Sequence, residues 1–235
     1  MKILRFVSIG FLIGFLLAQC SFTSSAQRYN NSREYDVENF TRIHLEGGYK
    51  VFLKQGDSPE LVIEASDDDV FDYYDVESGF SELRVTMKEK HFHFERLTLY
   101  VTFTELEEIH IEGGVKLETT GYIEVEDLGL KVEGGAKIEM NMKARNIKAV
   151  GEGGMLFDFE GVAESLDAKV SGAGHLDASE LEAKEVSFSI EGVGAGSVYA
   201  TDELWATIEG VGKIKYRGDP RVHKNVEGIG SISRD

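Results

Sequence analysis

The sequence predicts an all-β protein, folded as a single-stranded, right-handed parallel β-helix (a β-solenoid) with coils of about 20 residues. The first supporting observation is a short motif of an aliphatic residue, an acidic residue and glycine, which returns at a nearly constant interval through the second half of the chain. The second is the alternation of aliphatic and polar residues around each copy, which is typical of strands. The third is that no stretch after residue 26 has helical spacing of its apolar residues. The right-handed form is favoured because parallel crossover connections have that hand.

Residues 1–26 have the composition of a secretory signal peptide. Basic residues precede an apolar run, and a small-residue cleavage site ends at Ala26. The run is too short for a stable membrane span, so we expect no transmembrane span in the mature chain. Residues 17–20 also resemble a lipobox, although Gln19 stands where a small residue is usual, and lipid anchoring at Cys20 stays open. We therefore expect an exported protein of the periplasm, the outer membrane or the cell surface.

Charge and cysteine content exclude some classes of function. The 235 residues carry a formal net charge of −17 and include one cysteine. Nucleic-acid binding needs a basic surface, so we expect no nucleic-acid partner. After cleavage at residue 26 the mature chain has no cysteine, so its stability has to come from a continuous apolar core. We expect no cofactor.

The mature chain divides into a leader and one repetitive domain. Residues 27–36 are polar and are expected to form a flexible leader, and residues 37–235 form the β-solenoid. Within it, residues 109–235 are the regular coils. Residues 37–108 also alternate as strands do, but an acidic stretch at 66–79 favours a loop or a short helical turn. The pattern leaves open whether residues 37–108 form complete coils or a cap.

Glycine occupies one position of every regular coil. A Cβ atom there would collide inside the stack, and a tight corner can need positive φ values that glycine reaches without strain. Gly192–Gly196 also resembles a phosphate-binding loop, but such loops precede a helix and here a strand follows. We therefore interpret the repeated glycines as structural corners: Gly113, Gly134, Gly153, Gly172, Gly192, Gly210 and Gly228.

Three apolar columns are expected inside the stack, because alternate side chains of a strand share a face. They stand six residues before, two residues before and four residues after the first glycine of each coil. The columns are Leu128, Ile147, Leu166, Val186, Leu204 and Val222; Ile111, Val132, Val170, Ile190, Ile208 and Val226; and Leu117, Ile138, Phe157, Leu176, Ile214 and Ile232.

Several segments carry a family resemblance. They include Phe40-Thr41-Arg42-Ile43, Lys54-Gln55-Gly56-Asp57 and Leu61-Val62-Ile63-Glu64-Ala65, then Tyr216-Arg217-Gly218-Asp219-Pro220 and the closing Gly228-Ile229-Gly230-Ser231-Ile232. On these residues the chain resembles the GIN-domain family, described as autotransporter adhesin head domains of bacterial envelope proteins, over roughly residues 37–233. The resemblance implies a right-handed β-helix in an exported protein of a Bacteroidetes-type organism. It implies no catalytic residue.

A column of glutamates is the main candidate binding surface. Each glutamate stands directly before the first glycine of a coil and would point outward, about 4.8 Å from its neighbours in adjacent coils. Carboxylate clusters suit cations such as calcium, so the column is a hypothesis for a cation-binding or partner-binding stripe. The alternative is a solvated edge, whose repulsion is eased by Lys116, Lys131, Lys137 and Lys213. The column consists of Glu112, Glu133, Glu152, Glu191, Glu209 and Glu227.

Four smaller features each have a functional and a structural interpretation. His91–Glu95 places two histidines and a glutamate on one face of a strand, but three side chains of one flat strand rarely converge on an ion, so no metal site is predicted. His44 and His110 are interpreted as two copies of one exposed repeat position. Trp205 has outward parity and is either a contact aromatic for sugar or protein or a residue packed against a loop. Arg217-Gly218-Asp219 spells a cell-adhesion tripeptide but is interpreted as turn chemistry.

These observations favour a non-catalytic exported protein of the cell envelope or surface, with adhesin-like binding or self-assembly through the faces and edges of the solenoid. Its partner would be an unidentified protein or glycan, and an uncovered strand at the end of the solenoid would permit a homodimer. The alternative is a polysaccharide-acting β-helix enzyme, either a lyase or a hydrolase. Such enzymes gather acids and bases on long loops, which the regular intervals do not leave room for, so no catalytic residue is predicted.

Overall fold

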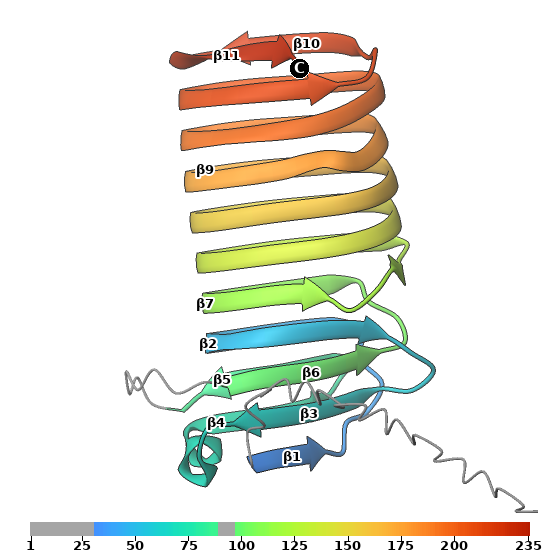
Figure 1. Ribbon diagram of the computed structural model, residues 1–235, viewed down its shortest axis with the longest axis vertical. Coiled ribbons are helices and arrows are strands. Elements are labelled where there is room, and N and C mark those ends of the chain that lie inside the picture. The colour runs from blue at the N-terminus through green and yellow to red at the C-terminus, as the bar shows by residue number, and fades with distance from the viewer. Residues whose placement is uncertain (1–30, 89–96) are drawn as a thin grey trace, which may run out of the picture.

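A computed structural model describes residues 31–88 and 97–235 of the chain, and the protein is all β, as predicted (Figure 1). Apart from one short 3₁₀ helix, the described elements are strands, stacked along the long axis of the molecule. No helix in the described part of the chain is long and apolar enough to cross a membrane. The expected signal peptide, Cys20 and the segment His91–Glu95 lie outside the described residues.

The strands form one sheet of mixed direction. In chain order the elements are β1 (Asn31–Tyr35), β2 (Arg42–Gln55), β3 (Glu60–Ala65), η1 (Asp68–Tyr73), β4 (Tyr74–Gly79), β5 (Glu82–Met87), β6 (Leu97–Phe103), β7 (Glu108–Thr119), β8 (Ile123–Glu124), β9 (Asp127–Arg217), β10 (Arg221–Val226) and β11 (Ile229–Arg234). The sheet order is β1-β3-β6-β2-β7-β9-β10, with β5 also on β2, β4 on β5, and both β8 and β11 on β9.

From β2 to the C-terminal strands the pairing is parallel. β2 lies beside β7, β7 beside β9, and β10 and β11 lie on β9. The register aligns like residues, because Gly47 opposes Gly113 and Gly113 opposes Gly134. β9 winds through successive turns without a break, which Figure 1 shows as the stacked ribbon from green to red. Equivalent residues of neighbouring turns therefore lie side by side.

The N-terminal part departs from the parallel coil that the sequence led us to expect. β1 pairs antiparallel with β3, β3 with β6, and β4 with β5, so the expectation of a purely parallel sheet is wrong for this part. Phe80 and Ser81 alone join β4 to β5, with φ values of 51° and 62°. Two consecutive residues with positive φ close an antiparallel hairpin, whereas a parallel pair needs a long crossover connection.

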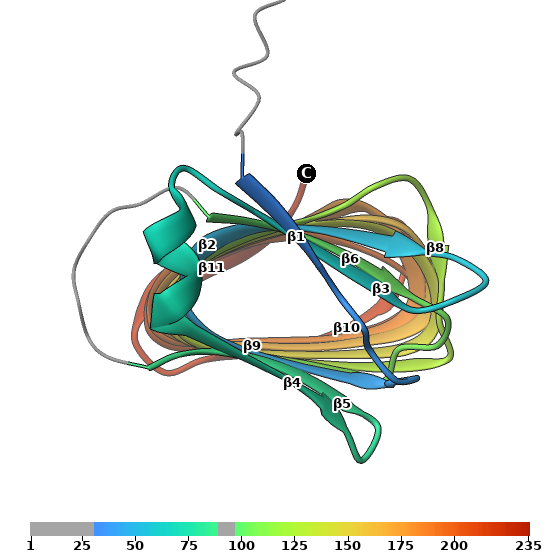
Figure 2. The ribbon, with the colours of Figure 1, turned by 90° about the horizontal axis from the view of Figure 1, so that it is seen from below.

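β1, β3, η1 and β4 cover one end of the stack (Figures 1 and 2). Val70 and Phe71 of η1 are buried, and the Arg33 guanidinium of β1 lies 4.1 Å from the centre of the Phe71 ring. β1 spans Asn31–Tyr35, so the second half of the segment expected to be a flexible leader is a paired strand. Residues 37–108 thus supply both a turn of the stack, through β2, and three of the elements that close its end, namely β3, η1 and β4.

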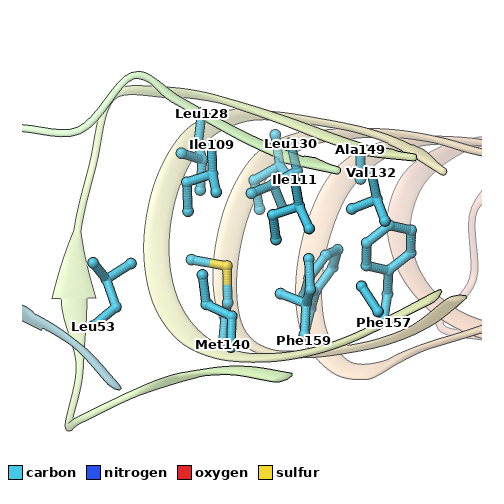
Figure 3. Close-up of a cluster of buried hydrophobic side chains, with 14 of the residues drawn as sticks. Leu53, Ile109, Ile111, Leu128, Leu130, Val132, Met140, Ala149, Phe157 and Phe159 are labelled. Atoms are coloured by element: carbon cyan, nitrogen blue, oxygen red, sulfur yellow. The ribbon is translucent and has the colours of Figure 1, made fainter. Parts of the chain in front are cut away.

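The interior of the stack is filled with aliphatic and aromatic side chains (Figure 3). Among the described residues no polar or charged side chain is buried. Ile111, Val132 and Phe157, taken from two of the predicted inward columns, are at most 1% exposed. Burying one such side chain stabilises the fold by about 1.5–3 kcal/mol relative to leaving it in water. The three columns therefore contribute to the cohesion between turns.

The inward columns end before the last turn. Val226 is 42% exposed, and Val222 and Ile232 are only partly buried, so the prediction that these three residues are sealed inside is wrong. They lie in β10 and β11, which pair with β9 on one side and with no other described strand. Their side chains therefore have neighbours on one side only.

The repeated glycines have the backbone conformation that was predicted, but the obstacle is different. Gly134 has a φ of +124°, and a Cβ built on it would lie 2.8 Å from the carbonyl oxygen of Gly113. The collision is thus with the backbone of the preceding turn rather than with core side chains. The same pattern of positive φ and close backbone holds along Gly113, Gly134, Gly153, Gly172, Gly192, Gly210 and Gly228.

Candidate binding surfaces along the stacked turns

The glutamate column lies on the outer face of the stack. Glu46 of β2, Glu112 of β7 and Glu133 of β9 are in direct register. The side chains of Glu112, Glu133 and Glu191 are about two-fifths exposed. The remaining members, Glu152, Glu209 and Glu227, are exposed as well. The column is therefore an outward acidic ridge.

Two lysines neutralise part of this ridge. Lys131 Nζ lies 2.5 Å from Glu133 Oε1, and Lys169 Nζ lies 2.6 Å from Glu191 Oε1. The lysine ammonium donates a hydrogen bond to each carboxylate, which lowers the pKa of Glu133 and raises the pKa of Lys169. Lys169 was not among the lysines predicted to ease the repulsion.

Lys116 and Lys137 belong to a different ladder. Lys116 Nζ lies 3.1 Å from Glu118 and 2.9 Å from Glu139, and Lys137 Nζ lies 2.7 Å from Glu139. These glutamates stand outside the predicted column, so the expectation that both lysines ease that column is wrong. The reason is lateral distance along the strand, because Lys116 is four residues from Glu112 but two from Glu118.

His44 and His110 are not the exposed positions that the sequence suggested. They oppose each other across β2 and β7, their ring centres are 4.6 Å apart, and their side chains are 13% and 21% exposed. Burial first, and then the nearby Arg84 guanidinium, lowers the pKa of His44 and favours its neutral form. Each ring shields the other from solvent. This burial arises from a contact between two strands that are distant in the sequence, so the sequence around either histidine does not predict it. Together with Glu112 they form a group of side chains able to hold a metal ion.

A polar groove of about 1260 Å³ opens where β7 connects through β8 to β9. Its lining comes from the end of β2, from the connection between β6 and β7, from the residues around β8 and from the first turns of β9. Gln55 fixes one wall, because its side-chain amide donates to the Glu124 carbonyl oxygen at 2.9 Å and accepts from the Glu124 amide nitrogen at 2.8 Å. The groove thus has a defined shape held by side-chain hydrogen bonds.

A polar column runs along this groove. Arg145 and Asn146 each donate to the Asp127 carboxylate at 2.6 Å, and Ser165 Oγ donates to Asn146 Oδ1 at 2.7 Å. The two donors lower the pKa of Asp127. We did not predict this column, although the sequence carries a signal for it. Asp127, Asn146 and Ser165 each stand seven residues before the glycine of their coil.

Trp205 lies on the outer face of the stack, closer to its C-terminal end than the groove. It is 40% exposed and stacks on the ring of His223 in β10, with ring centres 5.4 Å apart and planes at 9°. Trp205 stands five residues before its coil glycine, as do Lys148 and Asp167 in the groove. An exposed aromatic platform and a polar groove therefore follow one line up the stack.

The tripeptide Arg217-Gly218-Asp219 is engaged in local contacts. Arg217 donates to Glu180 at 2.7 Å and to the Ser179 carbonyl oxygen at 2.9 Å. Asp219 accepts from Arg234 at 3.2 Å. Both charged ends therefore have partners within the chain, which supports the interpretation as turn chemistry.

Solved structures with this fold include proteins of the genera Bacteroides and Parabacteroides. A “putative adhesin” from Bacteroides fragilis superposes with a TM-score of 0.80 at 21% identity, covering 87% of this chain and 96% of that one. A “putative lipid binding protein” from Parabacteroides distasonis gives 0.69 at 23% identity, covering 87% and 96%. A “putative adhesin” from Parabacteroides merdae gives 0.66 at 23% identity, covering 87% and 95%. At these identities the likeness shows a shared fold.

Sequence comparison assigns the family. No curated protein matches the chain. The family model described as “Putative auto-transporter adhesin, head GIN domain” matches residues 39–220, which is most of the chain. The protein therefore belongs to this GIN-domain family, in agreement with the segments that carried the resemblance.

Proposed function

We propose that this protein is a non-catalytic, adhesin-like component of the cell envelope or surface that binds a glycan along the groove and the Trp205 platform. The observation that carries the proposal is the alignment of both features on one outward line of the stack. Membership of an adhesin-head family supports a location in the envelope or at the surface. We further propose that the parallel turns from β2 onward wind as a right-handed β-helix, which the usual hand of parallel crossovers favours.

The chemistry of this line suits a sugar chain. Carbohydrate hydroxyls need donors and acceptors in fixed positions, and Arg145, Asn146 and Asp127 offer both from neighbouring turns. Trp205 adds an apolar ring face, flat against His223, on which the C–H face of a pyranose can stack. A site with a few convergent polar groups and an aromatic wall is typical of small-ligand recognition. Repetition every turn would favour an extended, multivalent ligand over a single sugar.

Glycan-array screening of the purified chain, followed by titration calorimetry on the best ligand, tests this proposal. We expect Trp205→Ala and Asn146→Ala each to weaken binding by about 10-fold or more, because each loss removes roughly 1–2 kcal/mol of contact energy. Tyr100→Ala is a matched aromatic control, since Tyr100 is 39% exposed and stacks on Phe52 but does not line the groove. Absence of any glycan ligand, or an equal loss in the control, would contradict the proposal.

A polysaccharide-acting enzyme is the competing function, and the groove gives it one supporting observation. Acidic and basic side chains do gather there, although long loops are not needed to bring them together. However, Arg145 pairs with Asp127 and Glu126, and Lys143 pairs with Glu124. A general acid needs a raised pKa, whereas the pKa of Asp127 is lowered. Release of reducing ends or unsaturated products from the bound glycan would establish the enzyme instead.

We also propose a homodimer through the end of the stack formed by β10 and β11. Both strands have a described partner on one side only, so their other edge is able to pair. Ile229 of β11 is 74% exposed and opposes Val211, itself 48% exposed. An exposed apolar pair beside an open strand edge favours association with a second copy over a free surface.

A further inference from the structure

His44, His110 and Glu112 come together only because two distant segments stack. β2 and β7 lie side by side (Figure 1), with His44 opposite His110 and Glu46 opposite Glu112. The two histidines are far apart in the sequence, with β3 to β6 between their strands. The three side chains come from two strands and are turned toward one another.

The distances between the candidate ligand atoms suit a small divalent cation. The Oε1 atom of Glu112 lies 3.4 Å from His44 Nε2 and 3.5 Å from His110 Nε2. Bonds of about 2.0–2.1 Å in a tetrahedral site place ligand atoms about 3.3–3.4 Å apart. A ligand atom from each of the three residues lies within 4.8 Å of the other two.

One of these atoms, Nε2 of His110, makes no hydrogen bond. In residues 31–88 and 97–235, His110 Nε2 is the only buried side-chain nitrogen or oxygen that makes no hydrogen bond. It lies 3.5 Å from carboxylate oxygens of Glu112 and Glu133, without hydrogen-bond geometry. Buried polar atoms are almost always satisfied, so an unsatisfied one points to a missing ligand, water or ion.

Glu112 is available to bind a cation, because the neighbouring Arg84 and Lys131 are paired with other carboxylates. Arg84 opposes His44 from β5 but is bound to Glu82 at 2.8 Å. Lys131 opposes His110 from β9 and is bound to Glu133 at 2.5 Å. The ion pairs of Glu112 in the described chain are with the two imidazoles.

We propose that His44, His110 and Glu112 bind a divalent transition-metal cation of the zinc class, with water in the remaining position. Two imidazoles and a carboxylate suit Zn²⁺, Ni²⁺ or Cu²⁺, whereas Ca²⁺ and Mg²⁺ take oxygen ligands. The ion would join β2 to β7 and so tie the closed end of the stack to the regular turns. This site is independent of the proposed glycan surface.

Titration calorimetry with Zn²⁺ on the purified, tag-free chain tests the proposal. We expect one equivalent bound per chain, undisturbed by excess Ca²⁺, which separates this site from the glutamate column. His110→Gln and Glu112→Gln should each weaken Zn²⁺ binding by at least about 10-fold, since loss of even an outer-shell partner costs that much. His223→Gln is the matched control, because His223 lies 3.6 Å from Glu203 but belongs to no metal-ligating group among the described residues.

Thermal unfolding provides a second readout, because a cation that binds only the folded state raises its Tm. Zn²⁺ should raise the Tm of the unaltered chain and of His223→Gln but not that of His110→Gln. If His110→Gln fails to fold, as judged by circular dichroism, His44→Gln and Glu112→Gln take its place. No bound Zn²⁺, or unchanged binding in the site variants, would overturn the proposal.

Discussion

Replacing Gly153 by alanine should destabilise the protein strongly, although the residue is exposed. Its φ is +118°, and a Cβ at this position would lie 2.5 Å from the carbonyl oxygen of Gly134. Positive φ costs a residue with a Cβ about 1–2 kcal/mol. The overlap is with backbone, which cannot rotate away, so overpacking adds about 1–3 kcal/mol. We therefore expect Gly153→Ala to lower the free energy of unfolding by about 2–5 kcal/mol.

The next residue provides the control. Gly154 is also exposed, has no positive φ in the strained range, and would have no heavy atom within 4 Å of a new Cβ. Gly154→Ala should be neutral or stabilising by about 0.5–1 kcal/mol, because alanine loses less conformational freedom in a strand. Urea and thermal unfolding followed by circular dichroism measure both variants, at about 2–4 °C of Tm per kcal/mol for a domain of this size. Equal effects of the two substitutions would refute the reasoning.

Two further predictions concern association and acid. Ile229→Lys should abolish the proposed homodimer. Val162→Lys is the control and should leave the dimer intact, because Val162 is an apolar residue, 44% exposed, elsewhere on the stack. Light scattering coupled to size-exclusion chromatography measures the mass of each variant, and a monomeric unaltered chain would refute the dimer. Lys116 donates to Glu118 and Glu139, which lowers the pKa of both carboxyls, chiefly through Lys116 for the first and Lys137 for the second. Because their folded pKa lies below the unfolded value, the stabilisation is present above about pH 4.5 and is lost as pH falls through the folded pKa. Lys116→Met should slightly reduce the loss of Tm on acidification, since exposed ion pairs contribute about 0.2–1 kcal/mol. An identical dependence of Tm on pH in the variant and the unaltered chain would show that the ion pairs of Lys116 contribute nothing.

The sequence specified the class of structure and the inward columns of the regular coils because both follow from local periodicity. Alternation with period two predicts strands, and the regular spacing of the coils placed Ile111, Val132 and Phe157 inside, where they are at most 1% exposed. The exceptions are Val226 and its neighbours in the last turn. Periodicity identifies the inward face of a strand, but burial also requires a neighbour on both sides.

Contacts between turns that are far apart in the sequence could not be predicted. β2 has β7 on one side and both β5 and β6 on the other, because the chain between β2 and β7 reverses direction and pairs β3 with β6 and β4 with β5 in antiparallel fashion. The turn residues Phe80 and Ser81 do not belong to the usual Asn-Gly or Gly-Gly types, so this hairpin gave no signal in the sequence. As a result, the number of residues between His44 and His110 is not a multiple of the coil length. The contact between the two imidazoles was therefore not predicted from the sequence.

Functional groups in a stacked fold converge along the stack rather than along the chain. Arg217 and Asp219 are two residues apart, yet each binds a residue from a different turn. Asp127, Asn146 and Ser165 are 19 residues apart, yet they form one hydrogen-bonded column. The physical reason is spacing, because adjacent turns are separated by the distance between paired strands, about 4.8 Å, while residues two apart on one strand are separated by about 6.6 Å. Ligand sites in such proteins are therefore best sought among equivalent positions of successive turns, where a side chain of one turn can reach the same position of the next.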